Sequence, residues 1–135
     1  MNEKHVPDRE HCQELDRLCK EKNITLPETE FYWVGNELLS SSNEDDALKL
    51  SYVEGLDNVK SKPIPAPLVS ELGEWLSSGI EQTWKRSGNK NWVVLFSPVT
   101  GDGTYQPVEQ EANTEANARQ KMLNYLIAEG IITTL

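Results

Sequence analysis

Apolar residues recur at helical spacing near both ends of the chain. Close to the N-terminus, Cys12, Leu15, Leu18 and Cys19 fall on one side of a helical wheel, and Asp8 precedes them as a potential N-cap. This pattern predicts a helix over about residues 8–22.

The segment NTEANARQKMLNYLIAEG, residues 113–130, carries the second helical pattern. Asn113 or Thr114 can cap its start, and Gly130 suits the position after its end. The stripe predicted to face the core consists of Ala116, Arg119 through its aliphatic stem, Met122, Leu123, Leu126 and Ile127.

Three prolines introduce a third helical pattern in PIPAPLVSELGEWL, residues 63–76. Pro63 and Pro65 hold the chain extended as the end of a linker, and Pro67 suits a first helical turn. A helix of about 11 residues should follow, with Gly79 as its C-terminal cap. We interpret it as a core helix and not as a docking peptide; its apolar stripe is Leu68, Val69, Leu72, Trp75 and Leu76.

Alternating and β-branched residues predict strands in the remaining segments. FYWVGNELLS predicts strands at about 30–34 and 37–40, joined by a tight turn at Gly35 and Asn36. In ALKLSYVE, Leu48, Leu50 and Tyr52 alternate with polar residues, which predicts a third strand at 47–53.

A second hairpin is predicted around Ser87, Gly88 and Asn89, in IEQTWKRSGNKNWVVLFSPV. A two-residue loop would pair Trp84 with Val93, and a three-residue loop with Asn89 in the left-handed region would pair Trp84 with Trp92. We favour the second register because it gives a better core surface than the first, which would leave Trp92, Val94 and Phe96 opposite charged residues. The core face of the second register comprises Ile80, Trp84, Trp92, Val94 and Phe96. TYQPVEQ can add a further strand, which Pro107 marks as an edge.

Together these elements predict an α+β fold, with an antiparallel sheet of about four to six strands packed against two or three helices. Residues 1–135 should form a single domain, made of an N-terminal helical segment (1–26) and an α+β core (27–135). The expected core comprises Trp33, Leu72, Trp75, Leu76, Trp84, Trp92, Val94, Leu123, Leu126 and Ile127.

The formal net charge of −9 narrows the range of partners. Between Lys22 and Lys49 there are six acidic residues and no basic one, and such a surface repels phosphate backbones. Nucleic acid is therefore an unfavourable direct ligand. The one basic spot flanked by aromatic residues is the hairpin tip WKRSGNKNW, residues 84–92, which carries Lys85, Arg86 and Lys90.

The chain contains few of the residue types that usually bind metals or form disulfides: two cysteines and two histidines. Cys12 and Cys19 would lie about 10 Å apart along a helix, too far for a disulfide, so we expect reduced thiols and a cytoplasmic setting. Neither cysteine has the paired spacing of a zinc site with His5 or His11, so no metal or cofactor is expected. No apolar run is long enough to span a membrane, so no membrane partner is expected.

Catalytic patterns are also missing from the sequence. Both histidines lie near the N-terminus, and no serine stands in a nucleophile elbow. The acidic pairs are typical of a solvated face and not of an acid and base with separated pKa values. We therefore expect no catalytic residue and a protein that is not an enzyme; the pairs considered are Glu71 with Glu74 and Glu109 with Glu111.

Four segments follow one another along the chain: FYWVGNELL, IPAPLVSELGEWL, the tryptophan-bearing hairpin and TEANARQKMLNYLIAEG. Over residues 30–130 this layout resembles that of small bacteriophage and prophage proteins. The resemblance implies a phage-derived accessory protein and no particular site residue, because that family has no assigned activity. We therefore expect a non-enzymatic module that binds a host or phage protein. The alternatives are an acidic nucleic-acid mimic that blocks a DNA-binding host enzyme, and a small ligand-binding domain or enzyme whose site is hidden in the sequence.

Overall fold

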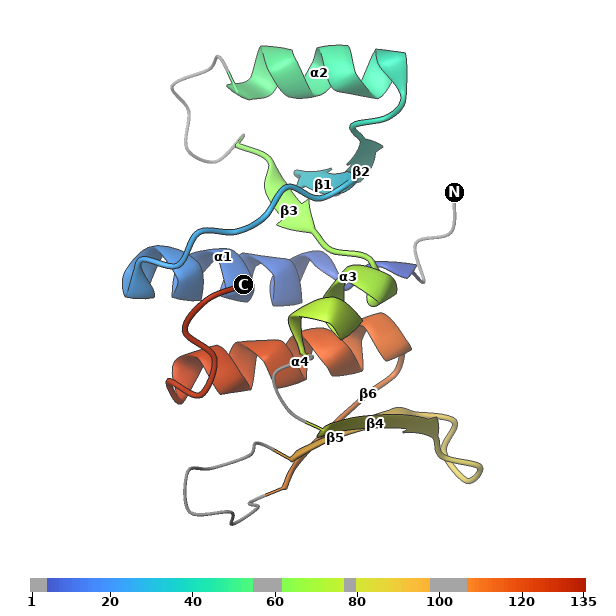
Figure 1. Ribbon diagram of the computed structural model, residues 1–135. Helices are drawn as coiled ribbons and strands as arrows, with labels where there is room; N and C mark the ends of the chain where they lie inside the picture. Colours follow the sequence, from blue (N-terminus) through green and yellow to red (C-terminus); the bar gives the residue numbers. More distant parts are fainter. Residues whose placement is uncertain (1–4, 55–61, 77–79, 98–106) are drawn as a thin grey trace.

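The computed structural model describes residues 5–54, 62–76, 80–97 and 107–135. These residues form four helices and two three-stranded antiparallel sheets (Figure 1), which confirms the α+β class. The strands are divided between two sheets, so the expectation of one sheet of four to six strands was wrong. Figure 1 shows helices α1, α3 and α4 between the two sheets.

Helices α1 (Arg9–Lys22) and α4 (Glu115–Ala128) match the predicted terminal helices. The Thr114 side chain caps α4 by accepting a hydrogen bond from the Asn117 backbone N–H at 3.1 Å. After the helix, Gly130 has a φ of 75°, a left-handed conformation that glycine adopts without strain.

The first sheet has the strand order β2-β1-β3. The predicted hairpin is confirmed as β1 (Phe31–Val34) and β2 (Glu37–Ser40). Strand β3 (Ile64–Ala66) comes from the proline-rich segment, where the sequence predicted only a linker. Pro65 lies opposite Tyr32 in this edge strand, where a missing N–H is tolerated.

Helix α2 (Glu44–Glu54) replaces the strand predicted at 47–53. Asn43 Oδ1 accepts a hydrogen bond from the Asp46 backbone N–H at 3.1 Å, and the acidic residues of the first turn suit a helix N-terminus. A strand would have placed Leu48, Leu50 and Tyr52 on one face. In the helix Leu50 is buried, whereas Leu48 and Tyr52 are each 71% exposed.

The second sheet has the strand order β4-β5-β6. Its strands are β4 (Ile80–Lys85), β5 (Trp92–Ser97) and β6 (Val108–Ala112). Strand β6 lies at the edge of the sheet, as Pro107 predicted, and residues 104–106 of the predicted strand lie outside the described residues. Trp84 pairs with Val93, so the preferred register with Trp92 was wrong. The residue in the left-handed conformation is Lys90, with a φ of 61°, and not Asn89.

This register determines which side chains face α4. Trp92, Val94 and Phe96 alternate on the face that packs against α4, whereas Trp84 belongs to the opposite face with Val93. Trp84 is 37% exposed, so its assignment to the core was wrong.

Helix α3 (Val69–Trp75) is shorter than the predicted 11 residues and has Leu76 as its C-cap. Gly79, the predicted cap, lies outside the described residues. The Leu68 backbone N–H donates to Glu71 Oε1 at 2.8 Å, which fixes the first turn.

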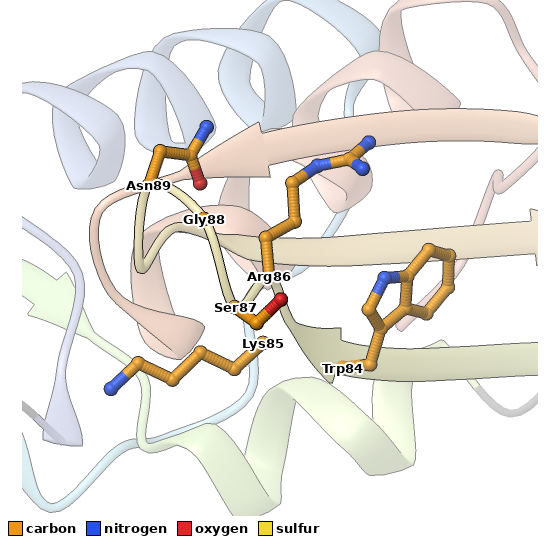
Figure 2. A pocket seen from close by; sticks show the side chains of 6 residues that line it. All are labelled: Trp84, Lys85, Arg86, Ser87, Gly88 and Asn89. Carbon is orange, nitrogen blue, oxygen red and sulfur yellow. The ribbon is translucent and has the colours of Figure 1, made fainter.

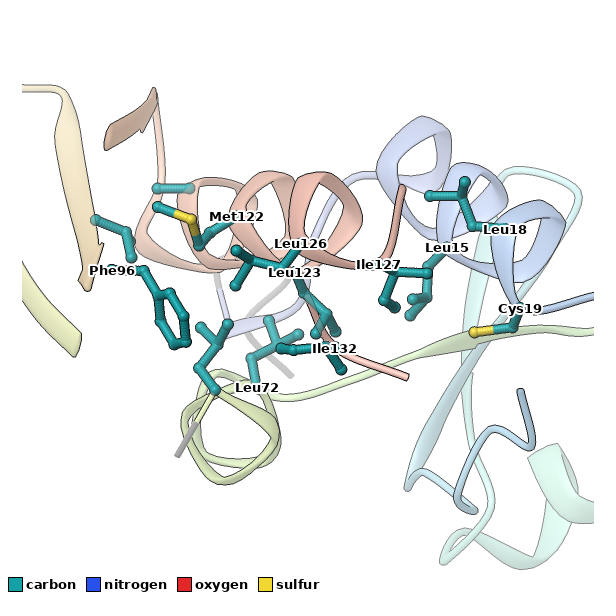
Figure 3. Packing of buried hydrophobic residues seen from close by; sticks show 13 residues of the cluster. Leu15, Leu18, Cys19, Leu72, Phe96, Met122, Leu123, Leu126, Ile127 and Ile132 are labelled. Carbon is teal, nitrogen blue, oxygen red and sulfur yellow. The ribbon is translucent and has the colours of Figure 1, made fainter. Parts of the chain in front are cut away.

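The main hydrophobic core lies where α1, α3 and α4 meet the inner face of the second sheet (Figure 3). Its buried side chains are Leu15, Leu18, Cys19, Leu72, Leu76, Val94, Phe96, Ala118, Met122, Leu123, Leu126, Ile127 and Ile132. Trp75 and Trp92, both expected in the core, are half-buried against it.

A second, smaller cluster joins α1 to the first sheet. It contains Val6, Cys12, Phe31, Trp33 and Ala66, so the predicted burial of Trp33 is confirmed. Because α1 supplies side chains to both clusters, the N-terminal helix links the two sheets.

Candidate protein-interaction site

The two thiols are free and buried. Burial raises the pKa of Cys12 to about 12 and that of Cys19 to about 11. Both sulfurs therefore stay protonated near neutral pH and are poor nucleophiles. Among the residues that the structure describes, no three His, Cys, Asp or Glu side chains are grouped to hold a metal ion.

Three of the four acidic residues considered as acid–base pairs have structural partners. Glu71 caps α3 through the Leu68 N–H. Arg86 forms ion pairs with Glu109 at 3.6 Å and with Glu111 at 2.6 Å across the outer face of the second sheet. Glu74 is exposed on α3.

The basic hairpin tip encloses a shallow hollow of about 480 Å³ (Figure 2). Figure 2 shows that the side chains of Trp84, Lys85 and Arg86 extend in different directions. Arg86 is already paired with two carboxylates. The basic residues of the tip are therefore neighbours in the sequence, but their side chains do not converge on one ligand.

Helix α2 presents the most exposed large apolar side chains of the described residues. Leu48 and Tyr52 lie one turn apart, and each is 71% exposed. Figure 1 shows α2 on the far side of the first sheet from α1, and β2 is its main neighbour. Within the part of the chain that the structure describes, no other element covers this face of α2.

A hollow of about 360 Å³ lies between α2 and the β1–β2 hairpin. Lys49 Nζ and Glu37 Oε1 form an ion pair of 3.4 Å at this site. We call the hollow the α2 groove; it is lined by Val34, Glu37, Leu39, Leu48, Lys49, Tyr52 and Val53.

The surroundings of the α2 groove are acidic. Glu44 and Asp45 are exposed in the first turn of α2, and Glu37 belongs to the groove itself. Lys49, the one basic residue of the lining, already pairs with Glu37. The same ion pair offsets the charge of Glu37, so the negative charge next to the apolar groove comes from Glu44 and Asp45, one helical turn before Leu48 and Lys49.

Comparisons of the chain with protein-family models, with curated proteins and with solved structures found no match. The resemblance to phage and prophage proteins therefore stays a prediction. Within the described ranges, no helix combines the length and the apolar character that crossing a membrane requires.

Proposed function

We propose that the protein is a non-enzymatic protein-binding module and that the α2 groove binds its partner. The observation that carries this proposal is the exposure of Leu48 and Tyr52 on one face of α2, beside a hollow. Single exposed apolar residues are ordinary on protein surfaces, whereas adjacent ones bordering a groove are typical of an interaction site.

The chemistry of the groove favours a partner segment with apolar side chains flanked by lysine or arginine. Covering Leu48 and Tyr52 would contribute about 1–2 kcal/mol for each side chain. Basic flanks would complement Glu44 and Asp45, which raises the association rate and selects the orientation of the partner.

A second copy of the chain is a poorer occupant for electrostatic reasons. Packing two α2 helices together would bring two acidic first turns close to each other, in a protein with a net charge of −9. We therefore propose a heterologous partner, a host or phage protein. The free thiols support a reducing, cytoplasmic setting for this interaction.

The test uses a synthetic amphipathic helical peptide of leucine and lysine, titrated into the isotopically labelled protein. Amide chemical shifts should change for residues 34–39 and 48–53. The double variant Leu48→Ala/Tyr52→Ala should weaken binding at least about tenfold. A peptide with glutamate in place of lysine should not bind.

Tyr125→Ala is the matched control, because Tyr125 is also an exposed aromatic residue on a helix but lies on α4. Equal losses in Tyr125→Ala and in the double variant would contradict the proposal. So would a stable dimer in sedimentation analysis that Leu48→Ala/Tyr52→Ala dissociates, because the α2 face would then be covered by a second copy.

A further inference from the structure

A second groove runs between one side of α1 and the start of β3. Its volume is about 610 Å³, within the range of small-molecule sites. Four of the thirteen lysine and arginine residues of the chain lie here. We call this the α1–β3 groove; its lining residues are Arg9, Gln13, Asp16, Arg17, Lys20, Lys62, Pro63 and Ile64.

Two of the four cations have carboxylate partners on α1. Arg17 bonds to Glu14 at 3.1 Å and to Glu21 at 2.6 Å, and Lys20 pairs with Asp16 at 2.9 Å. These pairs are exposed and lie within a single helix, so each is worth little and exchanges readily for a stronger anion.

The other two cations, Arg9 and Lys62, have no carboxylate within ion-pair distance in the described part of the chain. With the Gln13 amide turned so that its oxygen faces Arg9, that oxygen accepts from Nη1 at 3.0 Å and from Nη2 at 3.1 Å. Gln13 is neutral, so the charge of the guanidinium is not offset. Arg9 Nε is buried without a hydrogen-bond partner. A buried donor of this kind calls for a ligand or an ordered water.

We propose that the α1–β3 groove binds a small phosphate-bearing molecule, up to the size of a nucleotide, with at least two negative charges. Arg9 and Lys62 supply the primary contacts: the guanidinium offers the N–H groups that Gln13 does not bond, and the ammonium acts as a point charge. Pro63 and Ile64 are half-buried and form an apolar wall for the uncharged part of the ligand.

The net charge of −9 does not oppose a ligand of this size. An extended nucleic acid would have to follow the acidic surface, whereas a compact phosphate ester meets only the cations of one groove. The α1–β3 groove shares no lining residue with the α2 groove, so this inference stands independently of the proposed protein-binding function.

The experiment measures binding of pyrophosphate and of ATP by calorimetry, without added metal, at low ionic strength. Inorganic phosphate and adenosine test the contribution of each part of the ligand. Pyrophosphate and ATP should bind more tightly than about 1 mM, and adenosine should not bind. Both binding ligands should raise the unfolding temperature as their concentration increases.

Lys62→Gln and Arg9→Gln should each weaken pyrophosphate binding about tenfold. Lys62 is exposed, so its variant should fold normally even if Arg9→Gln does not. The matched control is Lys85→Gln, which removes a cation from the hairpin tip and should leave the affinity unchanged.

Two outcomes would overturn the proposal. One is the absence of pyrophosphate and ATP binding at about 1 mM. The other is a loss of affinity in Lys85→Gln as large as that in Lys62→Gln, because the anion would then bind at the hairpin tip.

Discussion

Replacing Gly73 by alanine should destabilise the protein, although glycine is an unfavourable residue in a helix. A Cβ at this position of α3 would lie 2.5 Å from Arg119 Nη1. That nitrogen donates to the Val69 carbonyl at 3.2 Å, and Nη2 of the same guanidinium pairs with Glu115 at 3.2 Å. The methyl group can enter only if the guanidinium moves away from α3.

The expected size of the effect follows from two opposing contributions. Alanine in place of glycine in a helix gains about 1 kcal/mol. A hydrogen bond from a charged, largely buried donor contributes about 1.5–3 kcal/mol, and displacing Arg119 from Val69 loses it. Gly73→Ala should therefore lower the free energy of unfolding by about 1 kcal/mol, or the unfolding temperature by about 4 °C.

Urea unfolding of the wild type, Gly73→Ala, Arg119→Ala and the double variant separates the two contributions. In the Arg119→Ala background the steric conflict is absent, so Gly73→Ala should stabilise by about 1 kcal/mol. A stabilising effect of the same size in both backgrounds would refute the reasoning, since it would show that the Arg119 guanidinium moves away without a loss in the free energy of unfolding.

Leu72→Ala should lower the free energy of unfolding by about 2–5 kcal/mol, because Leu72 is fully buried. Leu48→Ala should change it by less than about 0.5 kcal/mol, because Leu48 is exposed. Urea unfolding compares the two variants. Trp84→Ala should cost less than Leu72→Ala in the same assay despite its larger side chain; a greater loss would place the indole in the core. Cys12 and Cys19 should resist a thiol reagent at pH 8 in the native protein and react in denaturant. Their pKa values are raised on folding, so stability should fall as the pH rises above the ordinary thiol pKa of 9.0; a native state equally stable at pH 8 and pH 11 would contradict this.

The terminal helices could be predicted because local signals agreed with one another. In α4 the Thr114 cap, the apolar stripe and the left-handed Gly130 each indicate the same boundaries. In α1 the buried residues Cys12 and Leu15 follow the predicted spacing. Helix α4 therefore has local signals for its start, its buried face and its end. At the start of α1, Asp8 makes no side-chain capping hydrogen bond, and its carboxylate instead accepts from the Asn117 amide of α4 at 3.0 Å.

Helix α2 was mispredicted because its apolar pattern fits two periods. Leu48, Leu50 and Tyr52 alternate as a strand requires, yet Leu48 and Tyr52 also lie one turn apart on a helix. The deciding signals were the Asn43 cap and the acidic first turn, which the sequence does contain. The misassigned period also hid the α2 groove, because a strand would have buried the two residues that the helix exposes.

The register of the second hairpin was set by a feature with no clear sequence signal. Lys90 adopts the left-handed conformation, which non-glycine residues adopt rarely and asparagine more readily than lysine. Asn89 was the reasonable expectation, and a shift of one residue moved Trp84 to the opposite face. Arg86, the residue after β4, forms its ion pairs with Glu109 and Glu111 of β6 on that outer face, so these pairs link two segments that are distant in the sequence.

The two grooves show why the net charge of the chain restricts its possible partners less than the value of −9 suggests. The value of −9 is a sum over the chain, whereas a ligand meets the charges within about one Debye length, roughly 8–10 Å. On α1, acids and bases alternate along one exposed side, so the sum of their charges is small. Arg9 at one end of α1 and Lys62, two residues before β3, add positive charge, and neither has a carboxylate partner among the described residues. Folding thus creates a positive groove from residues far apart in sequence. The fold also places α2 against the β1–β2 hairpin, which forms the α2 groove next to the acidic first turn of that helix. An acidic chain can therefore disfavour a long polyanion and still offer one surface to a basic protein segment and another to a compact phosphate.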